Sequence, residues 1–234
     1  MPLAAVGLQK TTLIDFPGEV ACTVFTAGCN LRCPYCHNPE LVSGAPHSDM
    51  LPIKEFRSFL LKRKAVLGGV CITGGEPLLH QDIDELIDYI HELGLKVKID
   101  TNGTFPELLR SIKPDYIAMD VKTSLSKYHL LKGNSPYLEE KVLSSLKYII
   151  SSGIPHEFRT TVVPGIVDAE DIREIVNLIR GADRYVLAGF RGGKTLDPSF
   201  KDLSPYPPEV LDEMKVIAVD AGLMCHVRAN LVRS

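Results

Sequence analysis

The sequence predicts an α/β protein in which parallel strands alternate with helices. Short β-branched runs alternate along the chain with longer segments whose apolar residues recur every three or four positions. Several helical segments also end in glycine. Strict alternation favours a parallel sheet with right-handed crossovers. About six such units fall short of the eight in a complete barrel, so a partial barrel and an open sheet both fit the pattern.

The individual elements follow from these patterns. Strands are expected at 20–27, 69–74, 96–100, 116–121, 157–163, 184–190 and 223–227, each a short run that is rich in β-branched or other apolar residues. Helices are expected between them, at 52–67, 83–94, 105–112, 137–153, 169–181 and 208–222. Four of these helices end at a glycine that supplies a left-handed cap, namely Gly94, Gly153, Gly181 and Gly222.

The composition is that of an ordinary globular protein. The 234 residues are 45% hydrophobic and 24% charged, and we expect one domain, 1–234, with a core at about 18–190 and a C-terminal β/α extension at 191–234. A net charge of −3 attracts neither nucleic acid nor an anionic membrane. There is no basic leader and no apolar run of membrane-spanning length, which predicts a cytoplasmic protein.

Three of the six cysteines are clustered. The stretch GCNLRCPYCHNPE places Cys29, Cys33 and Cys36 within eight positions. Sites ligated fully by protein usually use four ligands. The cluster has three interpretations: core cysteines that are grouped by chance, a structural zinc site with His37 or Cys22 as the fourth ligand, or a [4Fe-4S] cluster that leaves one iron open. The loop also holds Gly28, Asn30, Pro34 and Asn38 and does not resemble a packed strand, which argues against the first.

The other three cysteines occur singly. Cys22, Cys71 and Cys225 lie in apolar, strand-like runs, and we expect each of them to be an inert buried thiol.

Polar and glycine-rich segments follow successive strands. The segment TGGEP (73–77) follows the second strand, DTNG (100–103) the third and MDVK (119–122) the fourth, while the fifth strand contains Arg159. Ligands of parallel α/β proteins bind at the carboxyl ends of the strands. Each segment by itself could be a simple turn, but their shared position predicts one polar pocket beside the loop that contains the three clustered cysteines.

These residues resemble a known family. The spacing of the three cysteines, the aromatic Tyr35 before the last of them, and GGEP one β/α unit later look like the radical S-adenosylmethionine enzymes. Within that superfamily, residues 5–190 are similar to the activating proteins of glycyl radical enzymes, above all those of anaerobic ribonucleoside-triphosphate reductase. The resemblance implies a partial (β/α)6 barrel of the radical SAM type with outer helices.

The resemblance also implies roles for individual residues. Cys29, Cys33 and Cys36 would hold a [4Fe-4S] cluster whose fourth iron binds S-adenosylmethionine (SAM). The implied SAM-binding residues are Tyr35 and His37 along the adenosine, Gly74, Gly75 and Glu76 at the methionine ammonium, Asp100, Thr101 and Asp120 in the polar pocket, Lys122 at the carboxylate, and Arg159. In the formate-lyase relative the groups that match Asp100, Thr101 and Asp120 also hold a monovalent cation.

The implied reaction is reductive cleavage of SAM to a 5′-deoxyadenosyl radical, which removes a hydrogen atom from a glycine α-carbon. The implied partners are a large glycyl radical enzyme and a flavodoxin- or ferredoxin-type electron donor, without nucleic acid or membrane. Asp15 in IDFPG resembles a DGPG segment of the formate-lyase activator, which implies a contact with the partner loop; a turn aspartate before Pro17 is the other interpretation.

The chain departs from these relatives at the end of the sixth strand, where LAGFRGGK places Ala188 and Gly189, and no cofactor role is assigned to either residue. No further cysteine cluster follows residue 190, which argues against larger peptide-modifying radical enzymes. Two alternative functions stay open. One is a small-molecule radical SAM enzyme of the 7-carboxy-7-deazaguanine synthase kind. The other is a non-catalytic metal-binding or electron-transfer protein.

Overall fold

A single nine-stranded sheet organises the protein. The computed structural model describes residues 2–44, 49–131 and 136–228, so the last six residues of the expected C-terminal extension lie outside the described residues. The strands are β1 (Ala5–Thr12), β2 (Ala21–Thr26), β3 (Leu51–Pro52), β4 (Gly69–Gly74), β5 (Lys96–Thr101), β6 (Tyr116–Asp120), β7 (His156–Val162), β8 (Tyr185–Gly189) and β9 (Cys225–Arg228).

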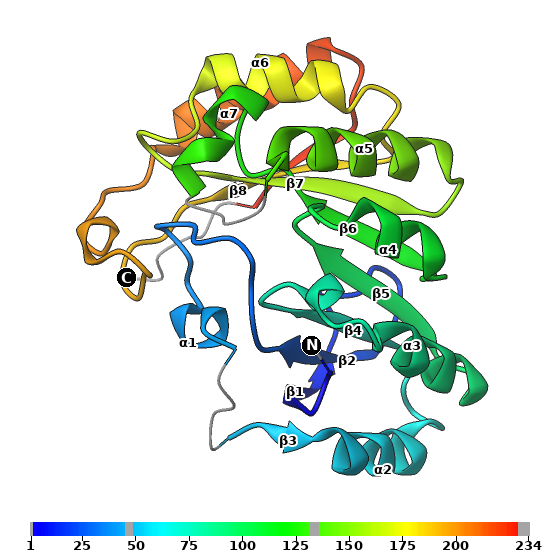
Figure 1. Ribbon diagram of the computed structural model, residues 1–234. Helices are drawn as coiled ribbons and strands as arrows, with labels where there is room; N and C mark the ends of the chain where they lie inside the picture. The colour runs from blue at the N-terminus through cyan, green and yellow to red at the C-terminus, as the bar shows by residue number, and fades with distance from the viewer. Residues whose placement is uncertain (1, 45–48, 132–135, 229–234) are drawn as a thin grey trace.

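The order of the strands confirms the predicted parallel sheet. Neighbouring strands follow the order β3-β1-β2-β4-β5-β6-β7-β8-β9, and every pair from β2 to β9 is parallel. β3 and β9 are the two edges, so the curved sheet stays open along one side (Figure 1). This is the partial barrel that the family resemblance implied.

Helices alternate with the strands as predicted, although α1 was not among the predicted helices. They are α1 (Pro39–Val42), α2 (Ile53–Arg63), α3 (Ile83–Glu92), α4 (Pro106–Ser111), α5 (Leu138–Ser151), α6 (Ala169–Leu178) and α7 (Pro208–Asp220), with short 3₁₀ turns η1 (Pro77–Leu79), η2 (Leu125–Leu131) and η3 (Pro198–Phe200). In α3 the buried residues Ile83, Leu86, Ile87 and Ile90 repeat at three- and four-residue spacing. Helices α3 to α7 lie on the outer, convex side of the sheet (Figure 1).

The two faces of the sheet differ in polarity. Along β5, Val97 and Ile99 join the hydrophobic core, whereas Lys98 and Asp100 make polar contacts with side chains of β4 and β7. Successive side chains of a strand point to opposite faces. The concave face therefore collects polar groups, while the apolar core lies between the sheet and the outer helices.

Two strands were not expected. β1 and β3 add to the edge beside β2, and both pair in the antiparallel sense. Within β1 only Val6 and Thr12 are buried, so the segment lacks the strong alternation that identifies a strand from sequence. No helix in the described part of the chain is long and apolar enough to cross a membrane.

Candidate functional site

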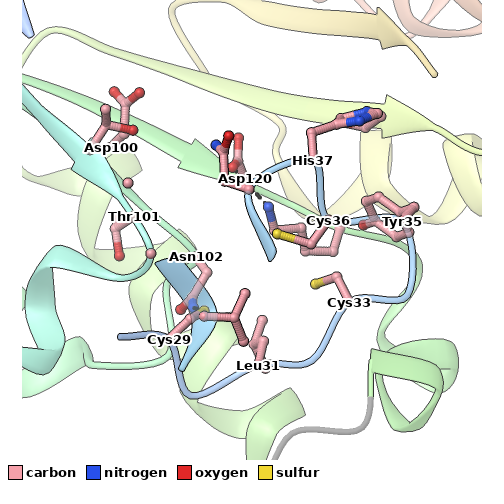
Figure 2. Close-up of a pocket in the computed structure, with 17 residues that line it drawn as sticks. Cys29, Leu31, Cys33, Tyr35, Cys36, His37, Asp100, Thr101, Asn102 and Asp120 are labelled. Atoms are coloured by element: carbon pink, nitrogen blue, oxygen red, sulfur yellow. Dashed lines mark hydrogen bonds and ion pairs between the residues drawn. The ribbon is translucent and has the colours of Figure 1, made fainter. Parts of the chain in front are cut away.

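A cavity opens where the parallel strands end. It lies between the loop after β2 and the carboxyl ends of β4, β5 and β6 (Figure 2). Its lining residues are Cys29, Leu31, Cys33, Tyr35, Cys36, His37, Asn38, Val42, Thr73, Gly74, Gly75, Asp100, Thr101, Asn102, Asp120, Lys122 and Thr161. All the predicted site residues except Glu76, Arg159 and Asp15 are in this set.

Backbone hydrogen bonds hold the cysteine loop (residues 27–38). The N–H of Gly28 donates to the carbonyl of Leu41 (2.6 Å) and the N–H of Cys36 donates to that of Cys33 (3.0 Å). The N–H of Arg32 donates to the carbonyl of Leu131 in η2 (2.9 Å). The loop is thus anchored at its start and in its middle, and Cys36 closes a turn on Cys33, although the loop contains no helix or strand.

The three clustered cysteines are free thiols that line the same cavity. In Figure 2 the side chains of Cys33 and Cys36 lie next to each other and their sulfur atoms point to the same side, whereas Cys29 lies beside Asn102, whose side-chain nitrogen is 3.9 Å from its sulfur. Burial raises the pKa of Cys33 to about 12 and also raises that of Cys29. Without a metal these two thiols stay protonated; a bound metal would deprotonate them.

A single metal ion and a four-iron cluster need different arrangements of the three thiols. In the described part of the chain, no three cysteine, histidine or carboxylate side chains converge closely enough to hold one metal ion. A four-iron cluster places each thiolate on a different iron, so its ligands are spread apart. Of the two fourth ligands considered for zinc, Cys22 is buried in the apolar core and does not line the cavity, whereas His37 lines it.

The GGEP segment is packed tightly against the start of the cysteine loop. Gly74 has a φ of +118°, and a β-carbon there would overlap the backbone of Thr26; one at Gly75 would overlap the carbonyl oxygen of Gly28. The N–H of Glu76 donates to that same oxygen (2.8 Å). Both positions therefore need glycine because the backbone here touches the backbone of Thr26 and Gly28. This contact brings the end of β4 against the cysteine loop.

The Glu76 carboxylate is fully buried behind the cavity and does not line it. It accepts hydrogen bonds from the N–H of Leu78 (3.1 Å), the hydroxyl of Thr101 (2.7 Å) and the N–H of Asn102 (2.7 Å). Burial raises its pKa to about 7, although these donors oppose the shift. Glu76 thus ties the end of β4 to the end of β5.

The DTNG segment connects β5 with the cysteine loop. The Asn102 side chain donates to the side-chain oxygen of Asn30 (3.0 Å), and the Asn30 amide donates to the hydroxyl of Thr104 (2.8 Å). Asn102 was not among the predicted site residues, because a turn asparagine is common and bonds its own backbone. The DTNG motif, which contains Asn102, was the sequence signal that could have identified it as a site residue.

A group of charged side chains lies at the cavity, with Asp100, Asp120 and Lys122 in its lining and Arg159 behind them. Arg159 bridges two carboxylates, with its Nε 2.8 Å from Asp120 and its guanidinium nitrogen 3.0 Å from Asp100. Lys122 lies 2.9 Å from the other oxygen of Asp120. Burial alone would raise the pKa values of Asp100 and Asp120, but the neighbouring cations hold both below the usual range. Both carboxylates are therefore ionised at neutral pH.

The two predicted adenosine residues occupy different settings. Tyr35 is a buried residue of the cavity lining, and its hydroxyl has no hydrogen-bond partner among the described residues. A buried hydroxyl without a partner is uncommon and is often explained by a missing ligand or water. His37 stacks on Phe190 with ring centroids 5.7 Å apart.

The segment that follows β8 packs on the cysteine loop. The N–H of Asp197 donates to the carbonyl of Pro34 (2.9 Å), His37 lies 3.3 Å from the carbonyl oxygen of Lys194, and Lys194 pairs with Glu40 (2.7 Å). No role was predicted for this segment from the sequence. Its contacts show that it packs against the cysteine loop at Pro34 and His37.

Asp15 lies away from this cavity. It precedes β2 and accepts a hydrogen bond from the hydroxyl of Thr23 (2.6 Å), the third residue of that strand, and it is not among the residues that line the cavity. The neighbouring Phe16 is buried against Tyr116, with ring centroids 6.2 Å apart. A contact of Asp15 with a partner loop remains a prediction.

Comparison with known proteins decides the family. A model of the radical SAM superfamily matches residues 23–179, from β2 to the end of α6. The chain belongs to the radical SAM superfamily. Radical SAM enzymes use a [4Fe-4S] cluster and SAM, and the three free thiols and the unpaired Tyr35 hydroxyl around one cavity fit that pair of cofactors.

Two relatives of this radical SAM enzyme have names that describe an activating enzyme. It is 33% identical over 214 residues, 87% of this chain and 86% of the relative, to a Methanocaldococcus jannaschii protein that bears the provisional name glycyl-radical enzyme activating enzyme. It is 30% identical over 184 residues, 74% of each chain, to the pyruvate formate-lyase-activating enzyme of Clostridium pasteurianum.

A solved radical SAM structure shares the fold. The crystal structure of Streptococcus suis SuiB bound to SAM superposes with a TM-score of 0.66 at 20% identity over 87% of this chain. The present chain spans about half the length of SuiB, since the match covers 48% of that protein. At this identity the likeness establishes the fold of the enzyme and nothing about its substrate.

Proposed function

We propose that this radical SAM enzyme activates a glycyl radical enzyme, and that its partner is anaerobic ribonucleoside-triphosphate reductase. The observation that carries the proposal is the 33% identity, over most of both chains, to a relative named as a glycyl-radical enzyme activating enzyme. When bound, the reduced cluster and SAM supply the radical chemistry that removes a hydrogen atom from the partner's glycine. The protein binds, orients and shields these groups.

The cysteine loop is proposed to hold the cluster. Cys29, Cys33 and Cys36 provide three thiolates, and the iron without a protein ligand is the one that binds SAM. An open coordination position distinguishes a catalytic metal site from a structural one. The segment 190–197 supports this role because it packs on the loop at Pro34 and His37 and limits the access of solvent to it.

The strand ends are proposed to hold SAM. Lys122 lines the cavity and carries the positive charge that suits the methionine carboxylate. Backbone groups of Gly74 and Gly75 face the methionine ammonium, and the Tyr35 hydroxyl and His37 lie along the adenosine. Glu76 acts on this site through Thr101 and Asn102, which it holds in place.

A protein partner is supported by the open sheet. The concave face carries Ala188 near the end of β8, followed by Gly189, so this wall presents little side-chain volume. A glycine-bearing loop needs such room to reach the cavity. The electron donor is proposed to be a flavodoxin- or ferredoxin-type protein, and Asp15 is proposed to contact the partner loop.

The test is to mix the reconstituted, reduced protein and SAM anaerobically with purified anaerobic ribonucleoside-triphosphate reductase and to record the electron paramagnetic resonance spectrum. A glycyl radical signal that requires SAM and is lost in the Cys33→Ala variant is the expected result. SAM cleavage without a signal on the reductase would reject this partner. If the signal is also missing on other glycyl radical enzymes, a small-molecule substrate becomes the better account.

A further inference from the structure

Three cationic side chains surround two carboxylates on the concave face. Asp100 accepts from Lys98 through one oxygen and from Arg159 through the other (3.0 Å). Asp120 accepts from Arg159 through one oxygen (2.8 Å) and from Lys122 through the other (2.9 Å). All four carboxylate oxygens therefore already face a cation that belongs to the chain.

Lys98 is the most deeply buried of these cations. Its side chain is 2% exposed, compared with 20% for Lys122 and 19% for Arg159. It lies two residues before Asp100 on β5, so both side chains point to the same face of the sheet. A buried ammonium group needs a close counter-ion, because desolvation of an unpaired charge costs several kcal/mol.

Asp100 is that counter-ion. The other polar neighbour of the Lys98 ammonium is the thiol of Cys71, 3.7 Å away. Burial raises the pKa of Cys71 far above its usual value, so this thiol is protonated and uncharged at neutral pH. The charge of Lys98 is therefore balanced by Asp100 alone among its hydrogen-bonding neighbours in the described residues.

This arrangement does not fit the monovalent cation that the family resemblance implied. An added cation beside Asp100, Thr101 and Asp120 would meet carboxylate oxygens that already face Lys98, Arg159 and Lys122. It would also be repelled by these three positive groups in a buried setting, where charges are weakly screened. Two further carboxylates lie near this group: Glu157 is 3.9 Å from Arg159, and Asp15 acts on the Cys71 thiol that touches Lys98.

We propose that the Lys98 ammonium is the built-in counter-ion of Asp100, so that SAM binding by this protein does not depend on a dissociable monovalent cation. Lys98 is then a positioning residue: it holds Asp100, which lines the cavity, and does not touch SAM itself. The inference rests on the proposed SAM site at the strand ends, and not on the identity of the protein partner.

The first test uses the wild-type holoprotein with its cluster reconstituted. The dissociation constant of SAM is measured in buffers of equal ionic strength whose only monovalent cation is K⁺, Na⁺ or tetramethylammonium, which is too large for a side-chain-sized site. The expected result is a change of less than about twofold, because ionic screening is constant. A tenfold or larger weakening in tetramethylammonium would overturn the proposal.

The second test uses Lys98→Met in the same buffers. The variant leaves Asp100 short of one counter-ion, so SAM binding should weaken by about tenfold or more in tetramethylammonium and recover in K⁺ or Na⁺. Lys96→Met is the matched control, because Lys96 lies on the same strand but is exposed and pairs with Glu19. Its SAM binding should match the wild type in all three buffers.

A spectroscopic measurement supplements the binding data. The thermal midpoint of Lys98→Met, followed by circular dichroism without SAM, should rise when K⁺ or Na⁺ replaces tetramethylammonium, and that of the wild type should not. Equal midpoints for Lys98→Met in all three buffers would contradict the proposal. If Lys98→Met does not fold, the wild-type series decides the question, and Lys98→Met with Asp100→Asn removes both charges and should fold.

The outcome is independent of the partner. A protein that binds SAM without cation dependence but produces no glycyl radical on the reductase would retain Lys98 as counter-ion and lose the proposed function. A protein that activates the reductase but binds SAM only in K⁺ or Na⁺ would retain the proposed function and reject Lys98 as the counter-ion.

Discussion

Gly75 lies directly against the carbonyl group of Gly28, with no room for a β-carbon between them. The next N–H, that of Glu76, donates to the same oxygen at 2.8 Å. Since Gly28 immediately precedes Cys29, this contact sets how far the first cysteine stands from the end of β4. The cysteine motif begins at Cys29 and the GGE motif at Gly74, 45 positions later in the sequence. The two motifs are therefore parts of one packed unit.

Gly75→Ala should weaken the cluster more than the fold. The added methyl group would push the cysteine loop away from β4, and Cys29 would shift relative to Cys33 and Cys36. We expect less iron and sulfide to be retained after anaerobic reconstitution and weaker SAM binding. Gly94→Ala is the control: its φ of +76° makes alanine cost about 1–2 kcal/mol, but nothing lies within 4 Å. It should lower stability and leave the iron content unchanged; an equal loss of iron in both variants would contradict the account.

This contact also shows what sequence could and could not predict. The sequence indicated that GGEP and the cysteines share a pocket, because both follow parallel strands. It did not indicate that Glu76 faces inward, away from the cavity, since a carboxylate after a glycine pair looks the same whether it meets a ligand or three donors of its own chain. That distinction depends on how β4 and β5 pack together.

The cysteines should separate into two classes on substitution. Cys33→Ala should abolish cluster assembly and SAM cleavage, because it removes a thiolate that lines the cavity. Cys22→Ala should retain both, because Cys22 lies in the apolar core, and should cost only the stability of a small buried side chain. Iron and sulfide analysis after reconstitution checks both. Retention of a full cluster by Cys33→Ala would refute the ligand assignment.

Glu76 should make stability fall as the pH rises. Its pKa is about 7 in the folded protein against an ordinary value of 4.5. Between these two values the unfolded chain is ionised and the folded chain is not, so the unfolded state binds fewer protons. The unfolding free energy of the wild type relative to Glu76→Gln should therefore fall by about 1.4 kcal/mol per pH unit in this window.

Urea unfolding of the wild type and Glu76→Gln without the cluster, at several pH values, measures this slope. The difference in slope between the two proteins is the readout, because the substitution also changes hydrogen bonds by an amount that does not depend on pH. Parallel pH profiles would show that Glu76 does not titrate in this range.

Arg159→Met should destabilise the protein strongly. The substitution leaves Asp100 and Asp120 without their shared guanidinium, and breaking a buried pair in this way costs about 3–5 kcal/mol. The double variant Arg159→Met with Asp120→Asn should recover part of the loss. Arg173→Met is the control, because its ion pair with Glu170 is exposed and surface changes of this kind stay within about 0.5 kcal/mol. Denaturant unfolding measures all three; similar losses for Arg159→Met and Arg173→Met would contradict the bridging role.

The parts of the fold that sequence predicted are those with strong periodicity. β4 was predicted at its observed bounds, and the other parallel strands within about two residues. β1 was missed because its burial pattern alternates weakly, and β3 because it is an edge strand of two residues. From sequence, Lys98 was predicted only to be part of a strand. Its importance depends on contacts between strands, because β4 places Cys71 beside Lys98 and β7 places Arg159 beside Asp100.

The formation of 5′-deoxyadenosine from SAM by the reconstituted, chemically reduced protein tests the central claim most directly. The claim is that three cysteines hold a cluster whose fourth iron is open to SAM. The account predicts SAM-dependent formation of 5′-deoxyadenosine by the wild type and Cys22→Ala, and none by Cys33→Ala. A wild-type protein with an intact, reduced cluster that forms no 5′-deoxyadenosine would contradict it.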